Sequence, residues 1–128
     1  MCTSAVEPRQ ESVCVGDGVL LTVADTIRHS LGSGYLAARL GGDEFAILLP
    51  EIGSEGSVSI IDRVLRHLEE AMALKSWPVS FSIGVVSSFA PPRKVDRLLM
   101  AADRLMYEAK KQGKNLAHFG QENDWDEE

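Results

Sequence analysis

The feature that most constrains this chain is a pair of glycines, Gly41 and Gly42, between two short apolar runs at residues 35–40 and 45–49. This pattern predicts two strands joined by a tight hairpin, because glycine adopts the positive φ that such a turn needs. Asp43 and Glu44 follow at once, so the turn presents two carboxylates. Adjacent carboxylates suit a divalent cation, and glycine leaves room for a phosphate close to the backbone. The alternative is an exposed turn whose charges are only solvated.

Apolar residues recur at helical spacing in three further segments, which begin near residues 17, 58 and 95. Residues 79–85 alternate apolar and small side chains, the period of a strand, and residues 115–119 predict one more short strand. This order of elements predicts an α+β fold, an antiparallel sheet with helices packed on one face.

The length of 128 residues indicates one domain, and the 45% apolar and 25% charged content is that of an ordinary globular protein. We expect three regions: an irregular segment at 1–15, the domain at 16–119, and an acidic tail at 120–128 in which Trp125 is a candidate contact point. No apolar run approaches the ~20 residues that span a bilayer, and no secretory pattern is present, so a cytoplasmic protein without membrane contact is expected. The net charge of −6, without a basic stripe, argues against nucleic-acid binding.

Four motifs in this chain resemble, in order, those of the GGDEF family, the diguanylate cyclases that condense two GTP molecules into cyclic di-GMP. They are Gly-Asp-Gly-Val-Leu at 16–20, Gly-Gly-Asp-Glu-Phe at 41–45, Ser-Ile-Gly-Val at 82–85, and the stretch from Ala-Asp to Gly-Lys-Asn at 102–115. Each motif alone is weak, but four in family order make a specific match. The resemblance implies a ferredoxin-like fold, similar to the palm of nucleotidyl cyclases.

The resemblance implies that Asp43 and Glu44 hold Mg²⁺ and help the attacking 3′-hydroxyl of GTP to lose its proton. Chemistry agrees, because phosphoryl transfer depends mainly on positioning and on neutralising charge. Gly41 and Gly42 would let the phosphates approach the turn.

Three more residues match substrate-binding positions of the family. Asp17 corresponds to the residue that recognises the guanine edge, while Lys110 and Lys114 correspond to cations that contact phosphates. Lys114 replaces the usual arginine, so a compact ammonium stands where the family has a guanidinium that can form two parallel hydrogen bonds. The alternatives are that Asp17 only complements the start of a helix, and that the lysines are solvated charges at a helix end.

One part of the family pattern is missing, namely a strand with Asp-x-Asp that supplies the first metal ligands. Residues 11–15, Glu-Ser-Val-Cys-Val, stand directly before the motif at 16–20 instead. In the family that strand is central in the sheet, between the strands at 45–49 and 79–85. An empty position would leave backbone groups unpaired at about 1 kcal/mol or more each, against a total stability of ~5–15 kcal/mol. We expect the flanking strands to close up, residues 12–15 to enter, or a second copy to donate a segment.

The resemblance therefore predicts a diguanylate cyclase-type domain that is impaired on its own, because half of its metal clamp is missing. Family members act as dimers with one GTP in each half-site, so a homodimer is expected, with or without strand exchange. The alternatives are a module that binds GTP or a protein partner without turnover, and a fragment without selected activity.

Overall fold

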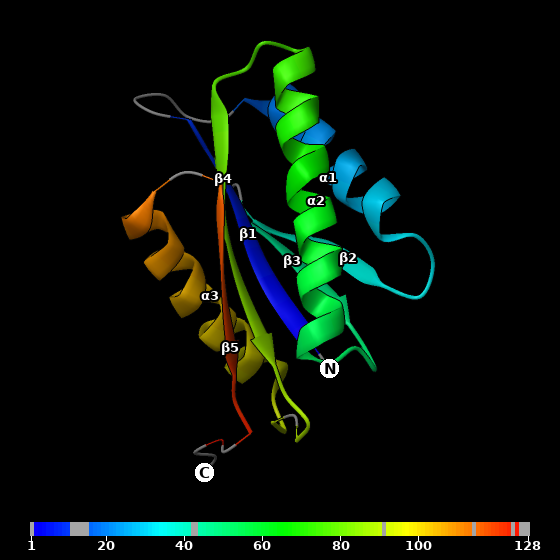
Figure 1. Ribbon diagram of the computed structural model, residues 1–128, viewed down its shortest axis with the longest axis vertical. Helices are drawn as coiled ribbons and strands as arrows, with labels where there is room; N and C mark the ends of the chain where they lie inside the picture. The colour runs from blue at the N-terminus through cyan, green and yellow to red at the C-terminus, as the bar shows by residue number, and fades with distance from the viewer. Residues whose placement is uncertain are drawn as a thin grey trace.

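The computed structural model describes residues 2–10, 16–41, 44–90, 92–113, 115–123 and 125. Within these ranges a five-stranded sheet is covered by three helices (Figure 1). In chain order the elements are β1 (Cys2–Gln10), α1 (Asp17–Leu31), β2 (Leu36–Gly41), β3 (Glu44–Leu49), α2 (Ser54–Leu74), β4 (Val79–Ser87), α3 (Val95–Gln112) and β5 (Leu116–Gln121). The predicted α+β class and the three predicted helices are confirmed. None of the helices in the described part of the chain has the length and apolar character needed to cross a membrane.

The strands lie in the order β2-β3-β1-β4-β5. Three of the four strand pairs are antiparallel, but β5 runs parallel to β4, with Ser82 opposite Leu116 and Ser87 opposite Gln121. The prediction of a purely antiparallel sheet is therefore wrong at this edge. The reason is that α3 joins β4 to β5 as a crossover, and a helical crossover returns the chain in the same direction.

The central strand is formed by residues 2–10, which the sequence analysis expected to be irregular. Strand β1 pairs with β3 from Cys2 to Val6 and with β4 from Cys2 to Gln10. This chain therefore fills the central position that the missing family strand would have left empty. The residues that fill it lie upstream of the segment 12–15 that we had considered, and the described sheet needs no segment from a second copy. Buried backbone groups require partners, and β1 supplies them to both neighbours.

Strand β1 tolerates a proline because of where the pairing with β3 stops. Val6 is the last residue of β1 paired with β3, and Pro8 lies beyond it with β4 as its neighbour. The missing N–H of Pro8 therefore removes no ladder bond on the β3 side. Ala5 and Val6 are fully buried, one on each face of the sheet.

The helices cover both faces of the sheet rather than one, which corrects the second part of the fold prediction. Helices α1 and α2 pack on the face that contains Val6 and Ile83, and α3 packs on the face that contains Ala5 and Val86 (Figure 1). Because β4 lies beneath helices on both sides, nearly all of its side chains are buried. This explains why burial continues through Val86 to Ser87, beyond the predicted end of the strand at Val85.

Helix α3 lies directly against the backbone of β4 at Gly84. A Cβ atom built on Gly84 would stand 2.0 Å from the carbonyl oxygen of Ala102 and 2.3 Å from the amide nitrogen of Met106. In the register Gly84 lies opposite Ala5, which in turn lies opposite Ala46. A row of small residues thus lets α3 approach the sheet closely.

The C-terminal segment is anchored to the turn that leaves β4, although the sequence analysis described it as an acidic tail. The Asn123 side-chain oxygen accepts a hydrogen bond from the Phe89 amide at 2.6 Å, and Trp125 Nε1 donates to the Ala90 carbonyl at 2.8 Å. The Trp125 ring packs against the core beneath α3. The prediction of Trp125 as a contact point is therefore confirmed, while residues 124 and 126–128 lie outside the described part.

Candidate functional site

Two carboxylates face α3 from neighbouring strands at the hairpin end of the sheet. Phe45 and Val6 point into the core beneath α1 and α2, so the adjacent residues Glu44 and Glu7 point to the opposite face. Val6 and Phe45 form the last pair between β1 and β3, and Glu7 and Glu44 are the residues that come next along the two strands. On its other side Glu7 pairs with Ser82 of β4. Acidic and small polar side chains therefore form one row across β3, β1 and β4.

Lys110, in the last turn of α3, reaches this row. Its ammonium forms an ion pair with the Glu7 carboxylate, and the two side chains are only 21% and 18% exposed. The Lys110 ammonium also lies 5.8 Å from the centroid of the Tyr107 ring. The sequence analysis assigned Lys110 to phosphate contact but missed Glu7, because residues 1–15 were not recognised as containing a strand.

The end of α3 is fixed to the sheet by Asn115. Its side-chain oxygen accepts a hydrogen bond of 2.9 Å from the Phe81 amide of β4. Asn115 has a φ of 53°, in the left-handed region that asparagine tolerates better than most residues. Asn115 thereby holds the C-terminal end of α3, including Lys110, close to the sheet.

The structure describes part of the predicted site. Gly41 ends β2 and is paired with Glu44 at the start of β3, so the two strands of the hairpin are confirmed. Asp17 is the first residue of α1, but its side chain is not described. The remaining predicted site residues, Gly42, Asp43 and Lys114, lie outside the described residues. The functional roles of all seven residues therefore stay predictions.

A cleft of about 480 Å³ opens between α1 and the strands of the hairpin. Its lining consists of Leu20, Leu21, Ala24, Ile27, Arg28, Ala37, Ala38, Arg39 and Phe45. The walls are mainly apolar, with two guanidinium groups among them.

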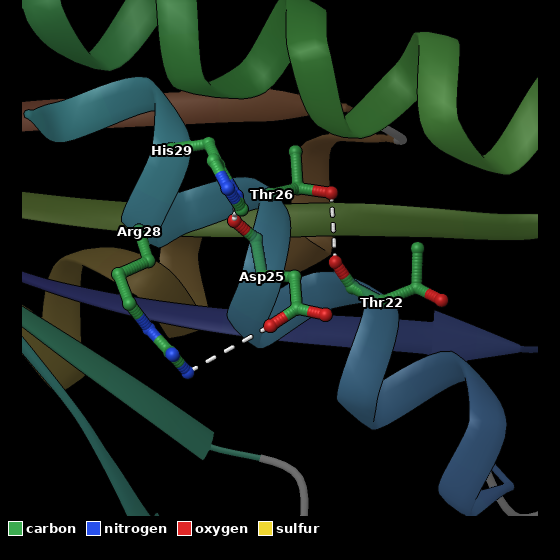
Figure 2. A network of polar contacts seen from close by, with 5 residues as sticks. All are labelled: Thr22, Asp25, Thr26, Arg28 and His29. Atoms are coloured by element: carbon green, nitrogen blue, oxygen red, sulfur yellow. Dashed lines mark hydrogen bonds and ion pairs between the residues drawn. The ribbon is translucent and has the colours of Figure 1, made fainter.

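Local polar contacts run along α1 (Figure 2), and one of the residues that make them, Arg28, also lines the cleft. Arg28 Nη2 lies 3.8 Å from Asp25 Oδ1, Thr26 Oγ1 donates to the Thr22 carbonyl at 2.7 Å, and His29 Nδ1 lies 2.7 Å from the Asp25 carbonyl. All of these contacts join residues three or four apart, and the Arg28 and Asp25 side chains are mostly exposed. An exposed pair of this kind contributes little stability, so Arg28 can turn toward an anionic ligand at small cost.

Whether the side chains of the row could bind a divalent cation depends on the ligand atoms that they offer. Glu44 and Glu7 offer carboxylate oxygens, the ligands that Mg²⁺ prefers. Within the described residues His, Cys, Asp and Glu side chains do not gather in a group of three, and Asp43 is outside that part of the chain. The donor type therefore fits magnesium, and further ligands would have to come from Asp43, backbone carbonyls or substrate.

A comparison with protein families places these elements in a known group. The family model for the diguanylate cyclase GGDEF domain matches residues 14–116. The chain belongs to the GGDEF family. The match includes the hairpin, Gly84 and Lys110, whereas β1 lies before its first residue.

Curated relatives of this GGDEF domain include named cyclases. It is 34% identical over 113 residues to the diguanylate cyclase TpbB of Pseudomonas aeruginosa, and 33% identical over 106 residues to the probable diguanylate cyclase DgcT of Escherichia coli. It is also 33% identical over 119 residues to the biofilm architecture maintenance protein MbaA of Vibrio cholerae. The alignments cover 85%, 79% and 84% of this chain but only 26%, 24% and 15% of those proteins.

Solved structures agree with the fold. An EAL/GGDEF domain protein from M. capsulatus gives a TM-score of 0.75 at 28% identity, covering 92% of this chain and 83% of that one. The GGDEF domain of TpbB from Pseudomonas aeruginosa gives a TM-score of 0.69 at 28% identity, covering 95% and 83%. The domain is thus of the diguanylate cyclase type in both sequence and fold.

Proposed function

We propose that this GGDEF domain binds GTP with Mg²⁺ at the hairpin end of its sheet and, as an isolated chain, converts GTP to cyclic di-GMP weakly or not at all. The observation that carries this proposal is the composition of the central strand. Strand β1 brings one carboxylate, Glu7, to the row beside Glu44, and that carboxylate is already paired with Lys110.

Binding of GTP is supported by the groups that surround the row. Lys110 and Lys114 would contact the phosphates, Gly41 and Gly42 would let them approach the turn, and Asp17 would recognise the guanine edge. The family match covers all five positions.

Asp43 and Glu44 are the residues we assign to magnesium. The ion, when bound, would neutralise charge on the triphosphate. Two acidic side chains at the turn would also orient the 3′-hydroxyl of a second GTP and accept its proton. Family members perform this reaction between two half-sites, which supports a homodimer.

Impairment is supported by what β1 lacks. The family's central strand carries Asp-x-Asp, whereas Glu7 in this chain is followed by Pro8 and Arg9. A clamp with fewer carboxylates loses part of a metal contribution worth several kcal/mol at the transition state. A slow or absent reaction follows, while binding of the nucleotide can persist.

The direct test is to incubate the chain with GTP and Mg²⁺, separate the products, and measure GTP binding by calorimetry on the same sample. We expect measurable binding with little or no cyclic di-GMP, and weaker Mg²⁺-dependent binding in Asp43→Ala. Asp62→Ala, an exposed acid of α2, is the matched control and should bind as the unmodified chain does. Robust product that disappears in Asp43→Ala would overturn the impairment, and absence of GTP binding would overturn the proposal as a whole.

A second candidate is an interaction module, favoured by the exposed edge of the sheet. Strand β2 is an edge strand, and Leu36 and Leu40 on it are 65% and 47% exposed. An apolar edge strand is a template for pairing with another chain. Sedimentation across a range of protein concentrations, repeated with Leu36→Glu, tests whether this edge supports a dimer, and a monomer at every concentration would contradict it.

A further inference from the structure

We propose that Glu7 is an electrostatic latch on Lys110, so that the Glu7 carboxylate holds the ammonium which would otherwise contact the phosphates of a nucleoside triphosphate. A triphosphate must displace this carboxylate before it can use the lysine. The inference rests on the proposed function, because it takes Lys110 as a phosphate contact.

The charge balance of the row favours a latch. The Glu7 carboxylate and the Lys110 ammonium form an ion pair, so their opposite charges offset each other. Both members of the ion pair are about four-fifths buried, so water screens their attraction less than at an open surface. A triphosphate that approaches this row meets a cation whose charge is already neutralised.

The ion pair is not needed to hold α3 in position. The helix contacts the β4 backbone at Gly84, and the Asn115 hydrogen bond to Phe81 fixes the turn that follows it. Both restraints are independent of charge. Removing the charge of Glu7 therefore leaves Lys110 in place but without its counter-ion.

Lysine is suited to such an exchange of partners. Its ammonium is a compact point charge with three donors on a flexible stem, so it can turn from a carboxylate to a phosphate without a change in the backbone. The nearby ring of Tyr107 offers the ammonium a second stabilising contact during the exchange.

The test measures the Kd of GTP by calorimetry for the unmodified chain and for Glu7→Gln, once in EDTA and once with Mg²⁺. Glutamine keeps the size of the side chain and removes only its charge. We expect the Kd to fall about fivefold or more in both solutions. Glu7→Asp keeps the charge on a side chain one methylene shorter, so its carboxylate lies farther from the Lys110 ammonium. It should give a smaller gain, and it replaces Glu7→Gln if that variant fails to fold.

Two controls separate the latch from a general effect of charge. Glu108→Gln removes one negative charge from α3, the helix that carries Lys110. Glu108 contacts His118, and this variant should change the Kd of GTP less than twofold. The gain from Glu7→Gln should also vanish when Lys110 is replaced by alanine.

The possible results distinguish the latch from other roles of Glu7. An unchanged or weaker affinity of Glu7→Gln in EDTA, with normal binding by the unmodified chain, refutes the latch alone. Weaker affinity only in Mg²⁺ also refutes it, because Glu7 would then act as a metal ligand. Failure of every variant to bind GTP refutes the proposed function together with the latch.

Discussion

Replacing Gly84 by alanine tests how closely α3 must lie against the sheet. The new methyl carbon would meet the Ala102 carbonyl oxygen at 2.0 Å and the Met106 nitrogen at 2.3 Å, and contacts below 3.0 Å are essentially never seen for real Cβ atoms. Both obstacles are backbone atoms, so no side-chain rotation relieves the clash. The helix must retreat by at least 1.0 Å, the difference between 2.0 and 3.0 Å.

A retreat of this size weakens the whole core beneath α3. A radial gap of about 0.5–1 Å already removes a quarter to a half of the dispersion energy of a contact. Overpacking usually destabilises by about 1–3 kcal/mol, and occasionally by more. We expect Gly84→Ala to lower the free energy of unfolding by about 3 kcal/mol, because α3 as a whole must move. The total stability of a domain is about 5–15 kcal/mol.

Urea unfolding followed by circular dichroism measures this loss as a lower midpoint. The matched control is Gly18→Ala in α1, where a Cβ meets nothing within 4 Å. Alanine in a helix is favoured over glycine by about 0.5–1 kcal/mol, so the control should be as stable as the original chain or more stable. A Gly84→Ala midpoint within error of the original would refute the close packing of α3.

Three further substitutions test contacts outside the hairpin. Asn115→Ala should destabilise by about 2 kcal/mol in urea unfolding, because it leaves the buried Phe81 amide without an acceptor. Asn115→Gly should lose nearly as much stability, because glycine adopts the positive φ without strain but has no side chain to accept the hydrogen bond. Full stability of either variant would contradict this role of Asn115. Trp125→Phe should lower the free energy of unfolding by about 1 kcal/mol, because the ring still packs but no longer donates a hydrogen bond to the Ala90 carbonyl. An unchanged free energy of unfolding would show that this bond contributes nothing.

Local patterns in the sequence predicted most of the elements but not how the sheet is completed. The Gly-Gly pair after residue 40 predicted the β2–β3 hairpin, and apolar periodicity predicted all three helices. Strand β1 was missed because Glu7, Pro8 and Arg9 interrupt its apolar pattern, and strand formation there depends on pairing with β3 and β4. Tertiary context outweighs local propensity at this position.

The second covered face of the sheet was missed for a related reason. Strand β4 alternates apolar residues with Ser80, Ser82 and Gly84, which predicts one covered face. On the other face Gly84 lies against the backbone of α3. Polarity alone does not distinguish a small residue in such a contact from one exposed to solvent.

The candidate site was predicted in part for the same physical reasons. Its acidic turn and its lysines stand in recognisable motifs, whereas Glu7 has no local signal and becomes part of the site only through the register of β1. Asn115 was recognised as a motif residue, but its hydrogen bond to β4 follows only from the return of the chain after α3.

The most direct test of this account is hydrogen exchange at the backbone amides of β1. We predict that Ala5 and Val6 exchange nearly as slowly as the core amides of β4, at every protein concentration, because β1 lies between β3 and β4 of the same chain. Fast exchange in β1 beside a protected β4, or protection that is lost on dilution, would contradict the claim that residues 2–10 complete the sheet and bring Glu7 to the site.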